Sequence, residues 1–515
     1  MADFDIVERL VDVFRRKNLS KDLPLSIEGP PRTKVEFLYQ GVLKGEFRND
    51  DEASSTIYKK NSSHPAYRKL KERLFEKLIL QVFLLDISKS FQNRESRSLF
   101  DCYLYFSCNK ILNGLSEPDA AYAIAKIGVK KALKNNLPTP GFLLSESNLI
   151  LAKRNENYVK NYQFFKKTSE QFLNAMLIEI EISRIYEKLI ISAAKGGNSK
   201  SIEVKKIVDK LLYYRNQIKH ISPLALIHYF YALSLAYLTG NNFKEAIKTC
   251  DSALKIVAKF KISSIHIINL LKAQCHLHLN EFALAKKELK KGEKHLLEKK
   301  INRLAFKEIE FMIFLRSGAF KDLCILYESA ISDPKFKTSI NLRNESWRQH
   351  GLLLLLLIKL NKIPPSESLE RIKPKLRLGK LMNEMPEFSK DKGGQNLAAR
   401  ILNVLILLTS KKFEAFEEAL PPLQAYIGRY KRHYPEIFRC DLMVKMLAGI
   451  PKVHYDAERS AWRAREYLEK MLVPPEELPL KITEMEVIPY EKIWQFVVEF
   501  LETLKRRPYS SKFKS

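Results

Sequence analysis

Apolar side chains recur along most of the chain at the three- and four-residue spacing of helices that bury one face. Leu70, Leu74, Leu78 and Val82 follow one another at intervals of four residues. Residues 62–65, Ser-Ser-His-Pro, suit a helix start, because a hydroxyl caps the first turn and a proline there loses no hydrogen bond. We therefore predict a helix that packs on other helices. The same periodicity predicts helices at residues 1–18, 99–112, 119–133 and 158–194.

Prolines, glycines and polar residues interrupt this helical pattern at several places, including the prolines at 474, 475 and 479. Pro24 and Pro30 begin a polar stretch that we expect to be a linker. The sequence from Leu137 to Gly141 contains two prolines, and we expect no regular helix there. Prolines and glycines between residues 361 and 396 predict a polar insertion with a short helix.

Between residues 224 and 336 the pattern becomes repetitive. Three segments begin with Phe243, Phe282 and Phe320, which are separated by 39 and 38 residues. In each segment a small or apolar residue follows three positions later, a larger apolar residue four later, and a small residue three later again. These spacings keep the four positions on one helical face, where small side chains let a neighbouring helix approach closely. Residues 396–426, with Phe413, are interpreted as a degenerate further copy.

This template resembles the tetratricopeptide repeat (TPR) family, whose unit is a helix–turn–helix of about 34 residues. Before the first copy, Phe230, Leu233, Ser234 and Tyr237 match the large, leucine, small and tyrosine positions of the family's first helix. The longer interval of this chain implies lengthened second helices. The resemblance implies an all-α, right-handed α-solenoid of antiparallel helix pairs. The apolar spacing adds an N-terminal helical region and, at residues 490–504, a C-terminal capping helix.

The interruptions and the repeats together predict six segments. They are an N-terminal helix and polar linker (1–60), N-terminal helical hairpins (61–150), a TPR-like repeat core (151–360), an insertion or loop (361–396), degenerate helical repeats (397–475), and a capping helix with a basic tail (476–515).

The composition favours a large helical core and no membrane span. The chain of 515 residues is 46% hydrophobic and has only 17 glycines, fewer than strands with tight turns require. Its six cysteines contain no C-x-x-C pair, so we expect core residues in a reducing compartment. The most apolar runs, residues 352–358 and 404–408, are far below the ~20 residues of a membrane span. The N-terminus lacks a secretory signal pattern, and we expect a cytoplasmic location.

The chain is strongly basic, with 88 Lys and Arg against 59 Asp and Glu and a formal charge of +29. Net charge bears on solubility and non-specific association and does not determine the fold. The basic residues are spread through nearly every predicted helix and are concentrated only at residues 429–434 and 505–514.

No motif for catalysis or cofactor binding is found. Residues 195–201 lack the spacing of a phosphate-binding loop and follow a predicted helix. Cys275, His276 and His278 come nearest to a metal cluster, but neighbours two apart on a helix face different directions. We therefore expect no enzymatic activity, no cofactor and no metal site.

The resemblance implies a concave groove lined by the first helix of each pair. Its expected lining mixes apolar and polar groups, which suits an extended peptide or a partner helix. Alternatively, these residues fill a groove that the chain's own helices close. The expected groove residues are His228, Tyr231, Leu235, Gln274, His278, Glu308, Met312 and Arg316.

A second candidate surface combines cations with aromatic rings. Cations that contact phosphates beside rings that stack on bases suit single-stranded nucleic acid. Alternatively, the tyrosines pack between helices while the cations face water. The residues are Tyr426, Arg429, Tyr430, Lys431, Arg432, His433 and Tyr434.

The leading hypothesis is a non-enzymatic TPR-like scaffold that binds a protein or peptide partner in its concave groove. The first alternative is an RNA- or DNA-binding helical-repeat protein that uses the basic-aromatic cluster. The second alternative is an enzyme built on the same scaffold.

Overall fold

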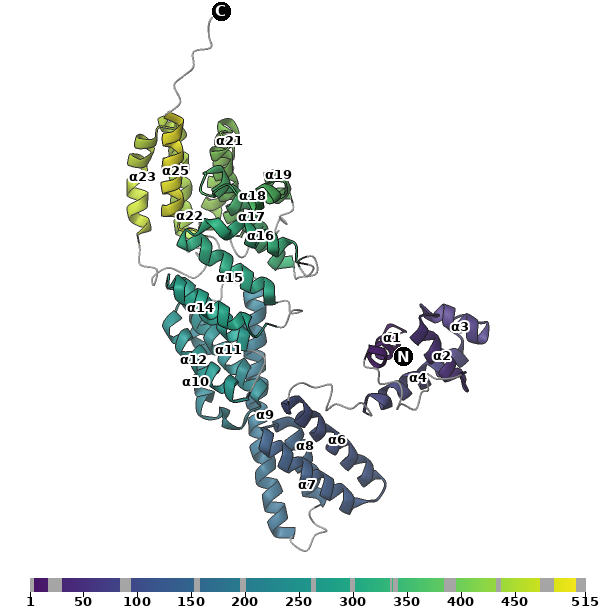
Figure 1. Ribbon diagram of the computed structural model, residues 1–515. Coiled ribbons are helices and arrows are strands. Elements are labelled where there is room, and N and C mark those ends of the chain that lie inside the picture. The colour runs from purple at the N-terminus through teal and green to yellow at the C-terminus, as the bar shows by residue number, and fades with distance from the viewer. Residues whose placement is uncertain are drawn as a thin grey trace, which may run out of the picture. The chain divides into compact units, whose positions relative to one another are not determined.

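The computed structural model describes most of the chain, and the statements below concern the described residues. These residues form helices and no strand, so the predicted all-α class is confirmed (Figure 1). The described ranges are 4–16, 30–83, 94–151, 158–194, 201–260, 265–296, 302–333, 336, 341–383, 395–431, 437–472 and 486–505.

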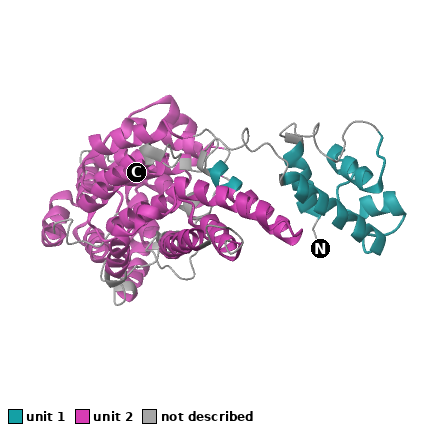
Figure 2. Ribbon diagram, turned by 90° about the horizontal axis from the view of Figure 1, so that it is seen from below, with its two compact units in different colours: residues 1–101 teal, residues 102–515 magenta. Residues whose placement is uncertain are grey.

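The chain divides into two compact units, residues 1–101 and 102–515, and each is described by itself (Figure 2). In the first unit, α4 packs against each of the three helices that precede it. The side chains of Phe14, Tyr39 and Tyr67 are fully buried in its core. The helices of this unit are α1 (Phe4–Arg16), α2 (Lys34–Lys44), α3 (Asp50–Tyr58) and α4 (Pro65–Phe83).

Two of these helices, α2 and α3, lie where we expected a linker up to residue 60, so that prediction was wrong. The side chain of Thr33 accepts a hydrogen bond from the N–H of Glu36 at 3.2 Å. In the same way, the side-chain oxygen of Asn49 accepts one from the N–H of Glu52 at 2.9 Å. The carboxylate of each glutamate in turn accepts a hydrogen bond from the N–H of the residue before the cap, Arg32 at 2.7 Å and Arg48 at 2.8 Å. Such reciprocal bonds stabilise a helix start by satisfying donors that the helix itself leaves free.

In the second unit, consecutive helices pack on one another through most of the chain. Contacts also join helices two apart in the chain order, α9 with α11, α11 with α13 and α13 with α15, as in stacked repeats. None of the described helices combines the length and the apolar composition that crossing a membrane requires. The helices are α6 (Arg94–Gly114), which begins in the first unit, α7 (Pro118–Asn135), α8 (Pro138–Leu151), α9 (Tyr158–Ala194), α10 (Ser201–Tyr213), α11 (Pro223–Thr239), α12 (Phe243–Phe260), α13 (Ile265–His278), α14 (Phe282–Glu293), α15 (Asn302–Ser317), α16 (Leu323–Ile331), α17 (Asn341–Lys359), α18 (Glu367–Ile372), α19 (Leu378–Asn383), α20 (Gln395–Thr409), α21 (Phe413–Lys431), α22 (Phe438–Gly449), α23 (Ala457–Met471) and α25 (Tyr490–Lys505).

The proline-containing sequence from Leu137 to Gly141 does not exclude a helix, contrary to our expectation. α8 begins at Pro138, so both prolines lie in its first turn, where their missing N–H groups would have no partner within the helix. Gly141 then permits close packing, because a Cβ atom there would lie 2.5 Å from the ring of Phe172 in α9.

The phenylalanines of the repeat template begin helices. Phe243, Phe282 and Phe413 are the first residues of α12, α14 and α21, and Phe320 begins the short 3₁₀ helix η5 (Phe320–Asp322) before α16. Two residues before each phenylalanine the backbone φ is positive, a conformation that ends the preceding helix. The same turn geometry therefore recurs in four helix pairs. The positive-φ residues are Asn241, Asn280, Gly318 and Lys411.

The small positions of the template allow neighbouring helices to pack closely. Ala253, Ala285 and Ala330 are fully buried. At Gly292 in α14, a Cβ atom would lie 2.7 Å from the ring of Phe306 in α15, so even alanine would force a shift. The sequence pattern thus marks real helix contacts.

A single core cluster joins the helices from α15 to α25. Trp347 of α17 is fully buried within this cluster, and Val497 and Leu501 of α25 extend it. α25 packs against α22 and α23. The guanidinium group of Arg439 in α22 pairs with the carboxylates of Glu486 and Glu491, each at 2.5 Å. These contacts attach the last described helix to the core.

Candidate functional site

The eight expected groove residues lie on three helices, α11, α13 and α15, and α13 contacts each of the other two. They recur every three or four residues on α11, α13 and α15, so each set occupies one face of its helix. α11 contacts α13, and α13 contacts α15. We call this surface the α11–α15 face. It consists of His228, Tyr231 and Leu235 on α11, Gln274 and His278 on α13, and Glu308, Met312 and Arg316 on α15.

At the α11 end, the aromatic residues of this face pack on α9. The imidazole of His228 stacks on the ring of Tyr186, with 4.4 Å between centroids and 5° between planes. Tyr231 meets the same ring edge-on at 5.6 Å. Burial lowers the pKa of His228. Tyr231 and Leu235 remain half-buried, so they keep accessible surface on this face.

In the middle of the face, His278 is committed to packing inside the chain. Its ring stacks on Phe243, the first residue of α12, with 4.8 Å between centroids and 2° between planes. Burial lowers its pKa to about 4, and the nearby Arg316 guanidinium contributes to this lowering. His278 is therefore neutral at pH 7. Gln274, one turn before it, is half-buried.

Arg316 is the cation of the α11–α15 face. Its Nη2 donates to the side-chain oxygen of Asn280 at 3.1 Å. Among the described residues, its Nε and Nη1 atoms have no hydrogen-bond partner although both are buried. Burial lowers the pKa of this guanidinium, and the carboxylate of Glu486 opposes that lowering. Arg316 thus retains unused donors.

At the α15 end, Glu308 is turned toward α17. Its carboxylate accepts a hydrogen bond from the hydroxyl of Ser346 and lies 3.9 Å from Nε2 of His350. Met312, one turn later, is half-buried and packs against two core clusters. His228, His278 and Glu308 therefore make contacts within the chain, and every residue of the face except the buried His278 is half-buried.

Only part of the basic-aromatic cluster is described. The guanidinium carbon of Arg400 lies 5.0 Å above the ring of Tyr426, which also packs against the core. One face of this ring is therefore covered and cannot stack on a base. Arg429 is exposed on α21. The side chains of Tyr430 and Lys431, and the whole of Arg432, His433 and Tyr434, lie outside the described residues.

The sequence around Cys275 does not gather metal ligands. Nδ1 of His276 pairs with the carboxylate of Glu281 at 2.6 Å, and burial raises the pKa of the Cys275 thiol well above its usual range. No group of three His, Cys, Asp or Glu side chains among the described residues could hold a metal ion. All six cysteines are free thiols, and only Cys108 is not fully buried.

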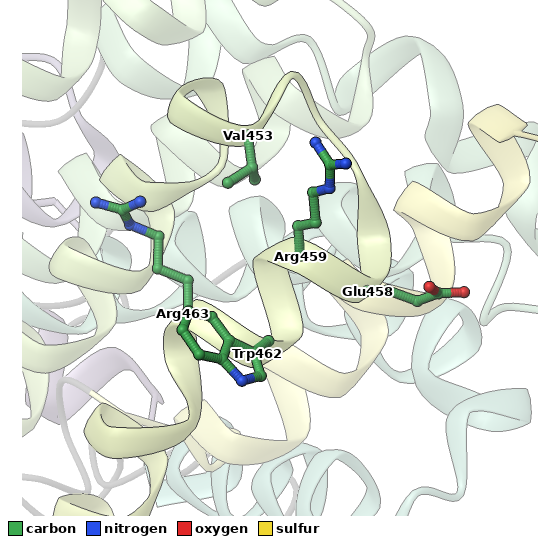
Figure 3. A pocket seen from close by; sticks show the side chains of 5 residues that line it. All are labelled: Val453, Glu458, Arg459, Trp462 and Arg463. Atoms are coloured by element: carbon green, nitrogen blue, oxygen red, sulfur yellow. The ribbon is translucent and has the colours of Figure 1, made fainter.

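A pocket that the sequence pattern did not indicate lies on α23 (Figure 3). Its volume is about 360 Å³, and the indole of Trp462 beside it is 77% exposed. The 3₁₀ helix η8 (Pro451–Val453) supplies its apolar floor. We call it the Trp462 pocket. It is lined by Val453, Glu458, Arg459, Trp462 and Arg463.

The charged side chains of the pocket have distinct orientations. The guanidinium groups of Arg459 and Arg463 lie on either side of Val453, whereas the carboxylate of Glu458 points away (Figure 3). The side chain of Arg463 passes over Gly449 at the end of α22, where a Cβ atom would lie 3.4 Å from its Cδ. Arg459 and Arg463 are exposed, and neither forms an ion pair with another described residue.

One signal in the sequence could have revealed this pocket. The buried positions of α23 include Ala457, Ser460, Ala464 and Met471, which lie three, four and seven residues apart. Trp462 falls outside that stripe, on the charged side of the helix. A large aromatic residue on the polar side of an amphipathic helix is a candidate contact.

Comparison with known proteins provides no relative from which a function could be transferred. Neither the protein-family models nor the curated proteins match the sequence. The α11–α15 face and the Trp462 pocket are therefore the basis for assigning a function.

Proposed function

We propose that this protein is a non-enzymatic, TPR-like scaffold, a right-handed solenoid of antiparallel helix pairs that binds a protein or peptide partner on the α11–α15 face. The observation that carries the proposal is that α11 contacts α13 and α13 contacts α15. Stacked repeats use such rows as extended binding surfaces. The six free cysteines suit a reducing compartment, and we propose the cytoplasm.

The composition of the face supports a protein partner. Tyr231 and Arg316 are half-buried, so each keeps part of its side chain accessible to a partner. Tyrosine and arginine in such settings frequently supply most of the binding energy of protein interfaces. Leu235 and Met312 add adaptable apolar contact around these two anchors.

The proposal predicts that a double change, Tyr231→Ala with Arg316→Glu, weakens capture of the partner about tenfold or more. The measurement is quantitative affinity capture from the native cytoplasm, with circular dichroism to confirm that the variants fold. A matched control, Tyr213→Ala with Arg465→Glu, changes a tyrosine that is 70% exposed and an arginine whose side chain is 75% exposed. Equal capture by the two double variants would exclude binding on the α11–α15 face.

A second candidate function is RNA or DNA binding, which the net charge of +29 and the exposed Arg429 favour. Binding through phosphates would weaken steeply as salt rises, because each neutralised phosphate releases counterions. Absence of a mobility shift with labelled single or double strands at low ionic strength would exclude this alternative.

A further inference from the structure

We propose that the Trp462 pocket docks an acidic segment of a partner protein, with one apolar side chain in the pocket and flanking carboxylates on Arg459 and Arg463. This inference extends the proposed protein-binding function to a second surface. It also specifies the chemistry of the partner.

The exposure of Trp462 distinguishes it from the other tryptophans of the chain. Trp347 is fully buried and Trp494 is 3% exposed, whereas Trp462 is 77% exposed beside a pocket of about 360 Å³. Tryptophan and arginine are the residues most enriched where interfaces gain their binding energy. The indole and Val453 form an apolar surface for one aromatic or branched aliphatic side chain.

The cations beside the pocket are available to a ligand. On the same helix, Arg465 is paired with Glu469 at 3.5 Å and Lys470 with Glu466 at 2.5 Å. Arg459 and Arg463 form no such pair among the described residues, and their guanidinium groups lie on either side of the apolar floor (Figure 3). Two unpaired guanidinium groups complement carboxylates, which they bind with paired hydrogen bonds.

The charges around the pocket favour an acidic peptide over nucleic acid. A single strand requires a continuous cationic groove along its backbone. On α23 the carboxylate of Glu458 interrupts the cations, and Arg465 and Lys470 already pair with Glu469 and Glu466, so the positive charge is not continuous along this helix. A peptide can place its acidic groups only beside the two arginines. Discrete carboxylates around one apolar residue therefore match this surface better.

The different exposures of the three tryptophans allow a direct test by fluorescence quenching. Because Trp347 and Trp494 are buried, acrylamide quenching of the full-length protein reports mainly on Trp462. The probe is a synthetic peptide with one phenylalanine between pairs of aspartate and glutamate. We expect saturable protection of Trp462 from quenching and no protection by the same peptide with lysines in place of the acidic residues.

Variants identify the groups that bind. Charge reversal at both Arg459 and Arg463 to Glu should weaken the peptide about tenfold or more, measured as the anisotropy of a labelled peptide. Trp462→Ala should weaken it in the same assay. Arg465→Glu, a charge change on the same helix outside the pocket, should leave the affinity within about twofold.

Three results would overturn the inference. They are no saturable binding of the acidic peptide, equal binding by the lysine peptide, and tighter binding by a single-stranded oligothymidylate that competes for Trp462. The double variant of the α11–α15 face should bind the peptide normally. Loss of partner capture and loss of peptide binding can therefore be told apart, and either hypothesis can fail alone.

Discussion

His278 and His350 are kept neutral by their packing inside the second unit. His278 stacks on Phe243, and His350 stacks on Phe311 with 4.8 Å between ring centroids. Burial lowers the pKa of His278 to about 4 and that of His350 to about 3, from 6.5 for a free imidazole. The carboxylate of Glu308, 3.9 Å from Nε2 of His350, does not offset this lowering.

These pKa values predict a loss of stability in mild acid. Below pH 6.5 these two imidazoles become protonated in the unfolded chain but stay neutral in the folded protein. The free energy of unfolding therefore decreases between pH 6.5 and about 4. At pH 5 the loss is roughly 2 kcal/mol for each histidine. His350→Phe should reduce the difference between urea unfolding at pH 7 and pH 5. An identical pH dependence in His350→Phe and in the unaltered protein would contradict this assignment.

The structural context of single residues is what the sequence predicted least well. Helical spacing placed His278 on one face of its helix, but it did not show what covers that face. Phe243, which stacks on His278, is 35 residues away in the chain. The ion pair of Arg465, and the lack of one at Arg463 among the described residues, depend on side-chain positions that spacing does not determine. The α11–α15 face followed from the resemblance, whereas the Trp462 pocket did not.

At the scale of helices, small residues at the template positions set how closely neighbours pack. Gly292 of α14 leaves no room for a Cβ atom, because the ring of Phe306 would lie 2.7 Å away. In contrast, a Cβ atom on Gly428 of α21 would have no neighbouring atom within 4 Å, and this glycine lies on an exposed part of its helix. The two glycines therefore form a matched pair.

Substitution of these glycines by alanine should have opposite effects. Gly292→Ala should lower the free energy of unfolding by about 1–3 kcal/mol, because overpacking moves α14 away from α15. Gly428→Ala should raise it by up to about 1 kcal/mol, because alanine favours a helix more than glycine does. Urea unfolding followed by circular dichroism measures both. Stabilisation by Gly292→Ala would show that α14 and α15 are not in close contact.

Most helices were predictable because their apolar spacing is regular over several turns. The start of α4 at Pro65 and the extent of α9 from Tyr158 to Ala194 agree with the sequence. α2 and α3 were missed because prolines precede this polar stretch and favour a linker over a helix. The capping pairs at Thr33 and Asn49 were present in the sequence and could have corrected this interpretation.

At the scale of the whole molecule, one turn geometry recurs within the second unit. A positive-φ residue precedes each of the four template phenylalanines by two positions, and consecutive helices pack on one another. The net charge of +29 is distributed over many helices and does not by itself indicate a ligand. Local surfaces therefore carry the functional proposal, with a protein partner on the α11–α15 face.

Hydrogen–deuterium exchange of the full chain, with and without the protein captured from the cytoplasm, tests this proposal most directly. We expect slower exchange on binding in α11, α13 and α15, and unchanged exchange in α12 and α14. Failure to capture any protein partner, or protection that spares α11, α13 and α15, would contradict the proposal.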